Sequence, residues 1–310
     1  AVKRFEERPA LGVHGGIGPA TLAAMNVSAA ERVAQIRVNL ERMRWVGEAL
    51  PPDYLLVDIT AQRVELYRDG QLAWETKAIV GRSERPTPIF RDRIEYLEFN
   101  PTWTVPPTIL KEDVVPKARK DPNAVRKKGL EIIDRRGNKV EPEAMDWNVS
   151  PNNLPYTFRQ APGPKNALGQ VKFMFPNRYS VYLHDTPDRH LFQRSRRTLS
   201  SGCVRVDKPL ELAELVLDDP KWNQEKFATV FASKRPSSVR LKKPLPVILS
   251  YWTAEVDAHG LMHFREDIYG QDGPVLAALD GPGGGIRLYR PAETAPAAPK
   301  DLVPEAGAKD

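Results

Sequence analysis

The chain has 310 residues, 41% of them hydrophobic, with 29 prolines, a formal net charge of +6 and a sequence pI of about 9.3. This length fits one large domain or two smaller ones, and so many prolines favour loops over long helices. A single cysteine excludes a disulfide scaffold and a zinc site with several thiolates, no apolar stretch is long enough to span a membrane, and no secretory signal opens the chain.

Residues 1–27 predict a helix, a turn and a second helix. Val2 and Phe5 are at helical spacing, residues 12–18 are rich in glycine, and Pro19 suits the first turn of the second helix. So short a unit cannot bury a core alone, and the chain begins inside the first helix. We therefore expect this unit to be part of a longer one.

An amphipathic helix is predicted over residues 29–45. Ser28, followed three residues later by Glu31, has the pattern of a capping box. Apolar side chains recur every three or four positions and predict the buried face, namely Val33, Ile36, Leu40 and Met43. Pro51 and Pro52 end this section.

From Tyr54 the hydrophobic period changes toward two, which predicts strands. The expected strands are Tyr54–Ile59, Arg63–Arg68, Gln71–Val80 and Ile94–Phe99. Asp69-Gly70, between the second and third of them, is typical of a tight hairpin turn.

Residues 107–165 interrupt this pattern. They are polar, charged and rich in turn residues, with helical propensity around Lys111–Lys120. Because loops of this length inside a compact domain are often functional, we expect an insertion or lid between strands.

The strand pattern returns after the insertion. The expected elements are strands over Val171–Phe175, Ser180–His184, Val204–Val206, Val247–Trp252 and Leu261–Phe264, and a helix over residues 208–217. The last two strands flank a turn at residues 258–260. The Ala/Pro-rich tail from Pro291 is predicted to be disordered.

Cys203, the only cysteine, lies in the run Ser200-Ser201-Gly202-Cys203-Val204-Arg205. Small residues before it let backbone N–H groups approach whatever the sulfur attacks, and His184, at the end of a predicted strand, could supply a base. If the two segments are neighbours, thiol and imidazole could meet across the strand ends. Spacing alone also allows a buried cysteine and an unrelated histidine.

Several separated motifs resemble the L,D-transpeptidase catalytic domain. His184-Asp185-Thr186-Pro187, followed by Ser200–Val206, is similar to the family signature of a histidine, a spacer and a Ser/Thr-His-Gly-Cys-x-Asn/Arg run. Other segments fit in the right order, namely Val80–Arg82 with Arg85–Pro88, Asn100–Pro107 and Pro162–Gly169. The resemblance spans about residues 54–270. It is greatest to the large Gram-negative branch, which carries an inserted capping subdomain.

The chain departs from the family pattern at one position. Ser201 stands where many members have histidine, which leaves His184 as the only histidine of the motif. Arg205 replaces the common asparagine, as the large branch allows.

The resemblance implies a role for each matched residue. Cys203 would attack the carbonyl between the third and fourth residues of a donor stem tetrapeptide, releasing the terminal D-alanine. His184 would take the thiol proton and later activate the acceptor amine. The backbone carbonyl of Asp185 would orient the imidazole, and the backbone N–H groups of Ser201, Gly202 and Cys203 would stabilise the oxyanion.

Four further residues are candidates for substrate contact. Tyr182 shares a face with His184 by strand alternation, although a core tyrosine fits equally well. Arg205, two residues after the cysteine, could hold a substrate carboxylate or form a structural salt bridge. Trp103 and Asn166 match family positions near the cleft, but they could also be a core side chain and a turn former.

The resemblance also implies the domain organisation and the fold class. Residues 1–27 resemble part of a peptidoglycan-binding module, and residues 28–52 would connect it to a catalytic domain at 53–270. The capping insertion would occupy about 107–165, and residues 271–310 would form a C-terminal segment. The expected fold is mainly β (α+β), an L,D-transpeptidase-type β-sandwich with a partly helical insertion and a short helical N-terminal segment.

The implied function is a periplasmic enzyme of a Gram-negative cell envelope that forms 3-3 cross-links between peptidoglycan stem peptides through a Cys203 thioester. Its partners would be a tetrapeptide donor, a stem-peptide amine acceptor and carbapenem (β-lactam) inhibitors, and a membrane anchor could precede the chain. No cofactor is expected, and no metal, because no cluster of carboxylates or cysteines accompanies His259 and His263. The positive charges are scattered along the chain, so we expect no nucleic-acid partner.

Two other functions stay open. A cysteine hydrolase of the same fold, either an L,D-carboxypeptidase or a cross-link-cleaving endopeptidase, would use the same catalytic residues. A catalytically inactive wall-binding protein would keep the fold without a reactive Cys203.

Overall fold

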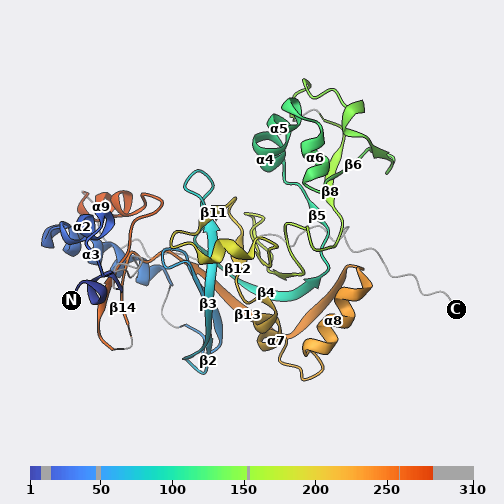
Figure 1. The fold of residues 1–310 in the computed structure, drawn as a ribbon. Helices are drawn as coiled ribbons and strands as arrows, with labels where there is room; N and C mark the ends of the chain where they lie inside the picture. The colour runs from blue at the N-terminus through green and yellow to red at the C-terminus, as the bar shows by residue number, and fades with distance from the viewer. Residues whose placement is uncertain (8–14, 47–49, 152–153, 258, 282–310) are drawn as a thin grey trace.

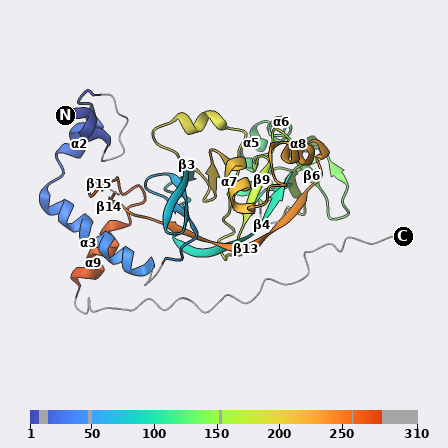
Figure 2. The ribbon, with the colours of Figure 1, turned by 90° about the horizontal axis from the view of Figure 1, so that it is seen from below.

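The computed structural model describes residues 1–7, 15–46, 50–151, 154–257 and 259–281, so the predicted tail from Pro291 lies outside the described residues. The fold is mainly β with added helices, as the sequence predicted (Figure 1). The N-terminal helices lie at one end of the molecule and the insertion lies at the other, with the main sheet between them (Figure 2). Within the described ranges, no helix is both long and apolar enough to cross a membrane.

Nine strands of the described chain form one sheet in the order β11-β3-β12-β10-β9-β4-β13-β1-β2, and β2 pairs again with β3. The sheet therefore closes on itself, so the two layers of the predicted sandwich are opposite walls of one ring. Its strands are β1 (Tyr54–Asp58), β2 (Arg63–Arg68), β3 (Gln71–Gly81), β4 (Phe90–Phe99), β9 (Val171–Met174), β10 (Leu183–His184), β11 (Thr198–Ser200), β12 (Val204–Val206) and β13 (Ser237–Ser250).

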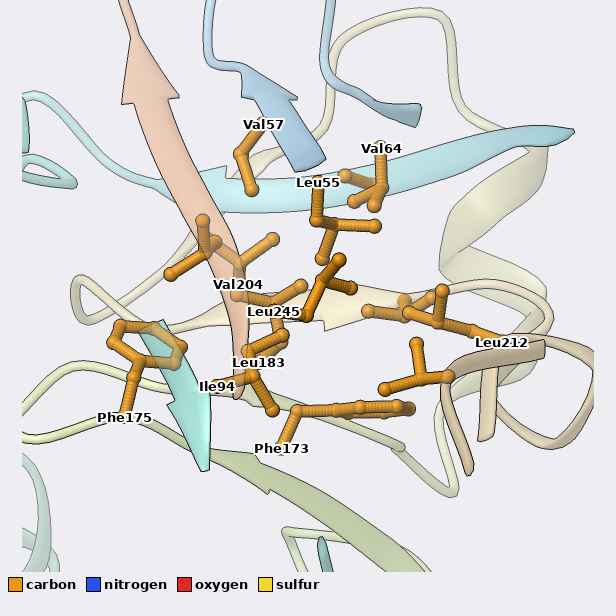
Figure 3. Packing of buried hydrophobic residues seen from close by; sticks show 14 of the residues in the cluster. Leu55, Val57, Val64, Ile94, Phe173, Phe175, Leu183, Val204, Leu212 and Leu245 are labelled. Atoms are coloured by element: carbon orange, nitrogen blue, oxygen red, sulfur yellow. The ribbon is translucent and has the colours of Figure 1, made fainter. Parts of the chain in front are cut away.

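Alternating apolar side chains fill the interior of this ring (Figure 3). Leu183 of β10 and Val204 of β12 are fully buried there, beside Ile94 and Phe173. The predicted helix α7 (Pro209–Leu217) adds Leu212 to the same core. Each buried aliphatic side chain of this kind contributes about 1.5–3 kcal/mol, so this core fixes the strands that carry the candidate site.

Two elements differ from the prediction. Strand β13 (Ser237–Ser250) begins ten residues before the predicted Val247–Trp252. Its first half was missed because Pro244 is unfavourable inside a strand. The register with β4 shifts between Arg240 and Leu245, so the proline lies at an irregularity of the pairing. Helix α8 (Gln224–Ser233) was not predicted at all, although its N-cap Asn223 accepts a hydrogen bond from the Lys226 N–H at 3.0 Å.

The strand predicted to precede the turn at residues 258–260 was wrong. The strands that flank this turn are β14 (Ala254–Val256) and β15 (Met262–Phe264), which pair with each other, whereas β13 pairs with β1 and β4. Residue 258 itself lies outside the described residues. Helix α9 (Asp272–Asp280) follows this hairpin.

The segment between β4 and β9 folds around a core of its own, separate from the main one (Figure 1). Its strands pair in the order β5-β8-β6-β7. The elements are β5 (Trp103–Thr104), α4 (Pro107–Ile109), the π-helical turn η1 (Leu110–Val114), α5 (Val115–Lys120), α6 (Asn123–Lys127), β6 (Glu131–Ile133), β7 (Lys139–Val140), η2 (Pro142–Ala144) and β8 (Thr157–Gln160). We call residues 103–160 the insertion from here on.

The N-terminal helices are α1 (Val2–Glu7), α2 (Pro19–Met25) and α3 (Ala29–Val46). At the start of α3 the predicted capping box is present, because the Ser28 N–H donates to the Glu31 carboxylate at 2.7 Å and the Glu31 N–H donates to Ser28 Oγ at 3.3 Å. The helix therefore begins where the sequence placed it.

The predicted buried face of α3 was wrong. Val33, Leu40 and Met43 are 50–59% exposed, and the buried side chains are Val38, Asn39 and Arg42. Polar contacts select this face, since α3 packs against the C-terminal hairpin and α9.

Asn39 carries much of this polar contact. Its amide accepts the Thr253 N–H at 2.9 Å and donates to Thr253 Oγ1 at 2.7 Å. Arg42 donates to the Asp272 carboxylate at 2.6 Å. Hydrophobic periodicity cannot reveal a face that is buried by hydrogen bonds.

Two neighbouring positions of α3, Asn39 and Leu40, should differ in how much their substitution destabilises the protein. Asn39→Leu should lower the free energy of unfolding by about 1–3 kcal/mol, because it leaves the buried Thr253 N–H without an acceptor. Leu40→Gln should change it by less than about 0.5 kcal/mol, because that side chain is exposed. Urea unfolding of both variants measures the difference, and a larger loss for Leu40→Gln would contradict the assigned face.

Candidate active site

The two candidate catalytic residues lie on neighbouring strands. β10 and β12 pair in parallel, with Leu183 opposite Val204 and His184 opposite Arg205. Leu183 and Val204 point into the core, so alternation places His184 and Arg205 on the outer face, together with the residues two positions before them, Tyr182 and Cys203. The Val204 N–H donates to the Tyr182 carbonyl at 3.1 Å, which extends the pairing to residues 200–203, the candidate nucleophile turn.

His184 is buried and held in one orientation. Its Nδ1 lies 2.5 Å from the backbone carbonyl of Asp185, as predicted. A carbonyl only accepts, so Nδ1 carries the proton and Nε2 keeps its lone pair. Burial, with help from the positive charge of Arg205 and Lys172, lowers the pKa of His184 to about 3 against the opposing effect of the Asp185 carbonyl. The imidazole is therefore neutral at physiological pH and able to accept a proton.

The residue that orients His184 is itself fixed from three sides. The Asp185 carboxylate accepts the Gln170 N–H and a guanidinium hydrogen of Arg189, both at 2.9 Å. Gly169 packs directly against it, because a Cβ added there would lie 2.2 Å from Asp185 Oδ2, and its φ of +62° also favours glycine. The sequence analysis did not identify Gly169 as a site residue.

The turn before Cys203 is held by two hydroxyl groups. Ser200 Oγ accepts the Gly202 N–H at 3.1 Å and donates to the Cys203 carbonyl at 2.5 Å. Thr87 Oγ1 donates to the Gly202 carbonyl at 2.8 Å. Gly202 has φ +114°, a conformation that only glycine adopts readily.

These contacts correct one sequence-based prediction. The Gly202 N–H is already donated to Ser200 Oγ, so it is not free for an oxyanion. Of the three predicted donors, the backbone amides of Ser201 and Cys203 are left.

The Cys203 thiol is protonated at rest. Burial raises the pKa of Cys203, while hydrogen bonds from the Tyr182 backbone amide and hydroxyl, and the charges of Lys172 and Arg205, act in the opposite direction. The Tyr182 ring meets His184 edge to face, with ring centroids 5.7 Å apart. Tyr182 therefore contacts both candidate catalytic residues, on the face that strand alternation predicted.

A row of charged side chains crosses the outer face at the level of His184. Glu98 on β4, Lys172 on β9, His184 and Arg205 are successive register partners. Lys172 Nζ lies 3.0 Å from the Glu98 carboxylate and 4.5 Å from the centroid of the Tyr182 ring. Lys172 is about nine-tenths buried and places a positive charge beside the thiol and imidazole.

Glu98 and Lys172 were missed by the sequence analysis. Lys172 lies between the core residues Val171 and Phe173, so alternation alone places it on the outer face. That β9 neighbours β10 follows only from the pairing of the sheet.

Arg205 has an unused donor. Its Nη1 lies 3.7 Å from the Asp188 carboxylate, whereas its Nε is buried and finds no hydrogen-bond acceptor in the described part of the chain. The long contact with Asp188 and the 21% exposed side chain fit both predicted roles of Arg205, a structural salt bridge and a substrate contact.

Asn166 and Trp103 occupy structural positions. Asn166 is buried, its amide donates to the carbonyls of Pro101 and Ala161 at 2.9 and 3.0 Å and accepts the Leu168 N–H at 2.8 Å. It shapes the turn before Gly169. Both the nitrogen and the oxygen of its side-chain amide are hydrogen-bonded to protein backbone groups. Trp103 is half-buried and packs on the core of the insertion.

No metal centre was found in the described ranges, where no group of three or more His, Cys, Asp or Glu side chains is placed to hold an ion. His263 pairs with Asp257 at 2.7 Å.

Residues 52–239 match the YkuD family model, which describes the L,D-transpeptidase catalytic domain. A Haemophilus influenzae protein provisionally named an L,D-transpeptidase is 38% identical over 241 residues, which is 77% of this chain and 48% of that protein. The chain thus spans about half the length of this curated relative.

Solved structures are similar at lower identity. The E. faecium L,D-transpeptidase catalytic domain acylated by ertapenem is 13% identical, covering 65% of this chain and 99% of that one, with a TM-score of 0.29. L,D-transpeptidase 3 from Mycobacterium tuberculosis is 12% identical, covering 64% and 61%, with a TM-score of 0.30. Because these TM-scores are low, the family assignment rests on the sequence match.

Because Gly169 packs against Asp185, adding one methyl group at Gly169 should destabilise the protein. Gly169→Ala should displace Asp185 and lower the free energy of unfolding by more than the about 1–2 kcal/mol expected from the left-handed φ alone. Gly129→Ala is the matched control, since Gly129 has φ +65° and nothing within 4 Å of an added Cβ. Chemical denaturation measures both losses, and imidazole ¹⁵N shifts report the His184 tautomer. Equal losses with an unchanged tautomer would contradict this contact.

The protonation states predict how Cys203 reacts with iodoacetamide. The alkylation rate should rise with pH through an apparent pKa above the ordinary thiol value of about 8.5, because burial raises the pKa of Cys203. Lys172→Met should move that pKa further up, since it removes a charge that stabilises the thiolate. A rate plateau between pH 5 and 7 would instead indicate a preformed thiolate–imidazolium pair and contradict the neutral resting site.

Proposed function

The chain belongs to the L,D-transpeptidase family, and we propose that it cross-links peptidoglycan stem peptides through a thioester on Cys203. The observation that carries this proposal is the parallel pairing of β10 with β12, which brings Cys203 and an oriented, neutral His184 to one face. A thiol and a base on one face, with the base held by a third group, fit a covalent acyl-transfer enzyme.

In the first half-reaction, Sγ of Cys203 attacks the carbonyl carbon between the third and fourth residues of a tetrapeptide donor. Nε2 of His184 accepts the thiol proton as the C–S bond forms. The tetrahedral oxyanion lies between the amides of Ser201 and Cys203, and each such donor contributes about 3–4 kcal/mol to the barrier reduction. The C–N bond then breaks, the imidazolium gives its proton to the leaving amine, and D-alanine departs.

In the second half-reaction, the acceptor amine of another stem peptide attacks the thioester carbonyl. His184 removes a proton from that amine, the C–S bond breaks, and the proton returns to the sulfur. The product is a 3-3 cross-link and the enzyme is regenerated without net change.

The charged groups around the thiol fit this sequence of steps. Negative charge appears on sulfur and then on oxygen, and Lys172 and Arg205 are placed to stabilise it. The partly exposed guanidinium of Arg205 would donate to a carbonyl or carboxylate of the donor peptide. Tyr182 would position the sulfur through its hydroxyl.

We assign the insertion the role of a cap over the donor site. Excluding water would let an amine resolve the thioester in preference to hydrolysis. The same proposal includes a periplasmic location in a Gram-negative cell envelope, a membrane anchor ahead of the chain, and inhibition by carbapenems.

Intact-mass measurement after incubation with a carbapenem tests the nucleophile. The wild type should gain one adduct, which Cys203→Ser should lose, and His184→Gln should form it about 10²–10⁴ times more slowly. A tetrapeptide donor with and without an acceptor amine then separates the reactions: a cross-linked dimer supports transpeptidation, whereas a tripeptide alone indicates a hydrolase. A wild type that forms neither adduct nor product would be an inactive wall-binding protein.

A further inference from the structure

The loop between β3 and β4 lies between the nucleophile turn and the insertion. Its base is fixed, because a Cβ at Gly81 would lie 2.3 Å from the Arg85 carbonyl oxygen and Tyr269 donates to the Gly81 carbonyl at 2.6 Å. Thr87 Oγ1 accepts the Gly81 N–H and donates to the Gly202 carbonyl, both at 2.8 Å. The Thr87 side chain thus binds the loop to the backbone of the nucleophile turn.

The Arg85 side chain extends this connection to the insertion. Its Nη1 donates to Ser201 Oγ at 2.9 Å and to the Asp113 carboxylate at 2.6 Å. Its Nε and Nη2 donate to Glu112 Oε2 at 3.1 and 2.5 Å. Arg82 adds a longer contact to Asp113, at 3.6 Å.

The two carboxylates belong to η1, a single π-helical turn at the start of the insertion. The Arg85 side chain is only 8% exposed, so the guanidinium depends on these carboxylates for its charge partners. Moving η1 away would remove both carboxylates that hold the guanidinium and would expose it to water. The Arg85 side chain would then be free to change rotamer, and its hydrogen bond to Ser201 would lose the support of these ion pairs.

We propose that Arg85 is a positioning residue that couples the place of the insertion to the shape of the nucleophile turn. With the insertion against the loop, Arg85 holds Ser201, and with it the Ser201 amide and the adjacent Cys203. With the insertion displaced, that restraint is lost and the oxyanion site is less well formed. This inference rests on the proposed function, because it assigns the restraint to the acylation step.

The test removes the charges at the insertion end and leaves the nucleophile turn intact. In the double variant Glu112→Gln/Asp113→Asn, carbapenem acylation of Cys203 should slow by about 10- to 100-fold, the usual consequence of a reacting group misplaced by about 1 Å. Hydrogen–deuterium exchange should rise in both residues 107–120 and residues 198–206. Alkylation by iodoacetamide, which needs no oxyanion site, should change by less than about threefold.

A matched control comes from the same insertion. Arg126 pairs with Glu141 and Glu143 at an exposed position, so Glu141→Gln/Glu143→Gln removes two similar charges without touching Arg85. This control should leave acylation and exchange in residues 198–206 at wild-type values. The variant Arg85→Lys keeps the positive charge but loses the forked geometry of the guanidinium. It should therefore retain only part of the wild-type rate of carbapenem acylation.

Two results would overturn the proposal. One is wild-type acylation by the Glu112→Gln/Asp113→Asn variant. The other is increased exchange confined to residues 107–120, which would mean that the insertion moves without affecting the nucleophile turn. If the wild type itself is not acylated, the proposed function fails, and the exchange experiment still decides whether Arg85 couples the two segments.

Discussion

The parallel pairing of β10 with β12 is the constraint on which the candidate site depends. Each strand is short, and each buries aliphatic side chains in the ring: Leu183 from β10, and Val204 and Val206 from β12. That burial fixes the register, because a shift by one residue would turn His184 into the core and Leu183 out of it. The stability of the core and the geometry of the catalytic pair are therefore one and the same requirement.

The electrostatics of the site follow from the same burial. Desolvation disfavours every charged form, so His184 and Cys203 are both neutral at rest. Lys172 and Arg205 favour negative charge on sulfur and oppose positive charge on the imidazole. The outer face thus favours negative charge at the sulfur over positive charge at the imidazole.

Local patterns predicted the elements whose structure is decided locally. The Ser28–Glu31 capping box, the strands flanking Asp69-Gly70 and helix α7 all lie where the sequence placed them. The family motifs singled out Cys203 and His184 as candidates, and alternation correctly placed Tyr182 on the face that they share. The features that the sequence did not predict depend on residues far away in the chain. The polar face of α3 is buried because Asn39 binds Thr253, and Lys172 lies beside His184 because of the order of the strands in the sheet. Similarly, the structural task of Asn166 needs Pro101, sixty-five positions away.

The closure of the main sheet limits how an extended peptide can bind. In a ring, both edges of β10 and β12 are already hydrogen-bonded to neighbouring strands, so a peptide cannot join there as one more strand. A peptide that reaches Cys203 must lie across the outer face and be recognised by side chains and turns. Selectivity would then follow side-chain chemistry at a few positions, and it could change through single substitutions without any change in the sheet.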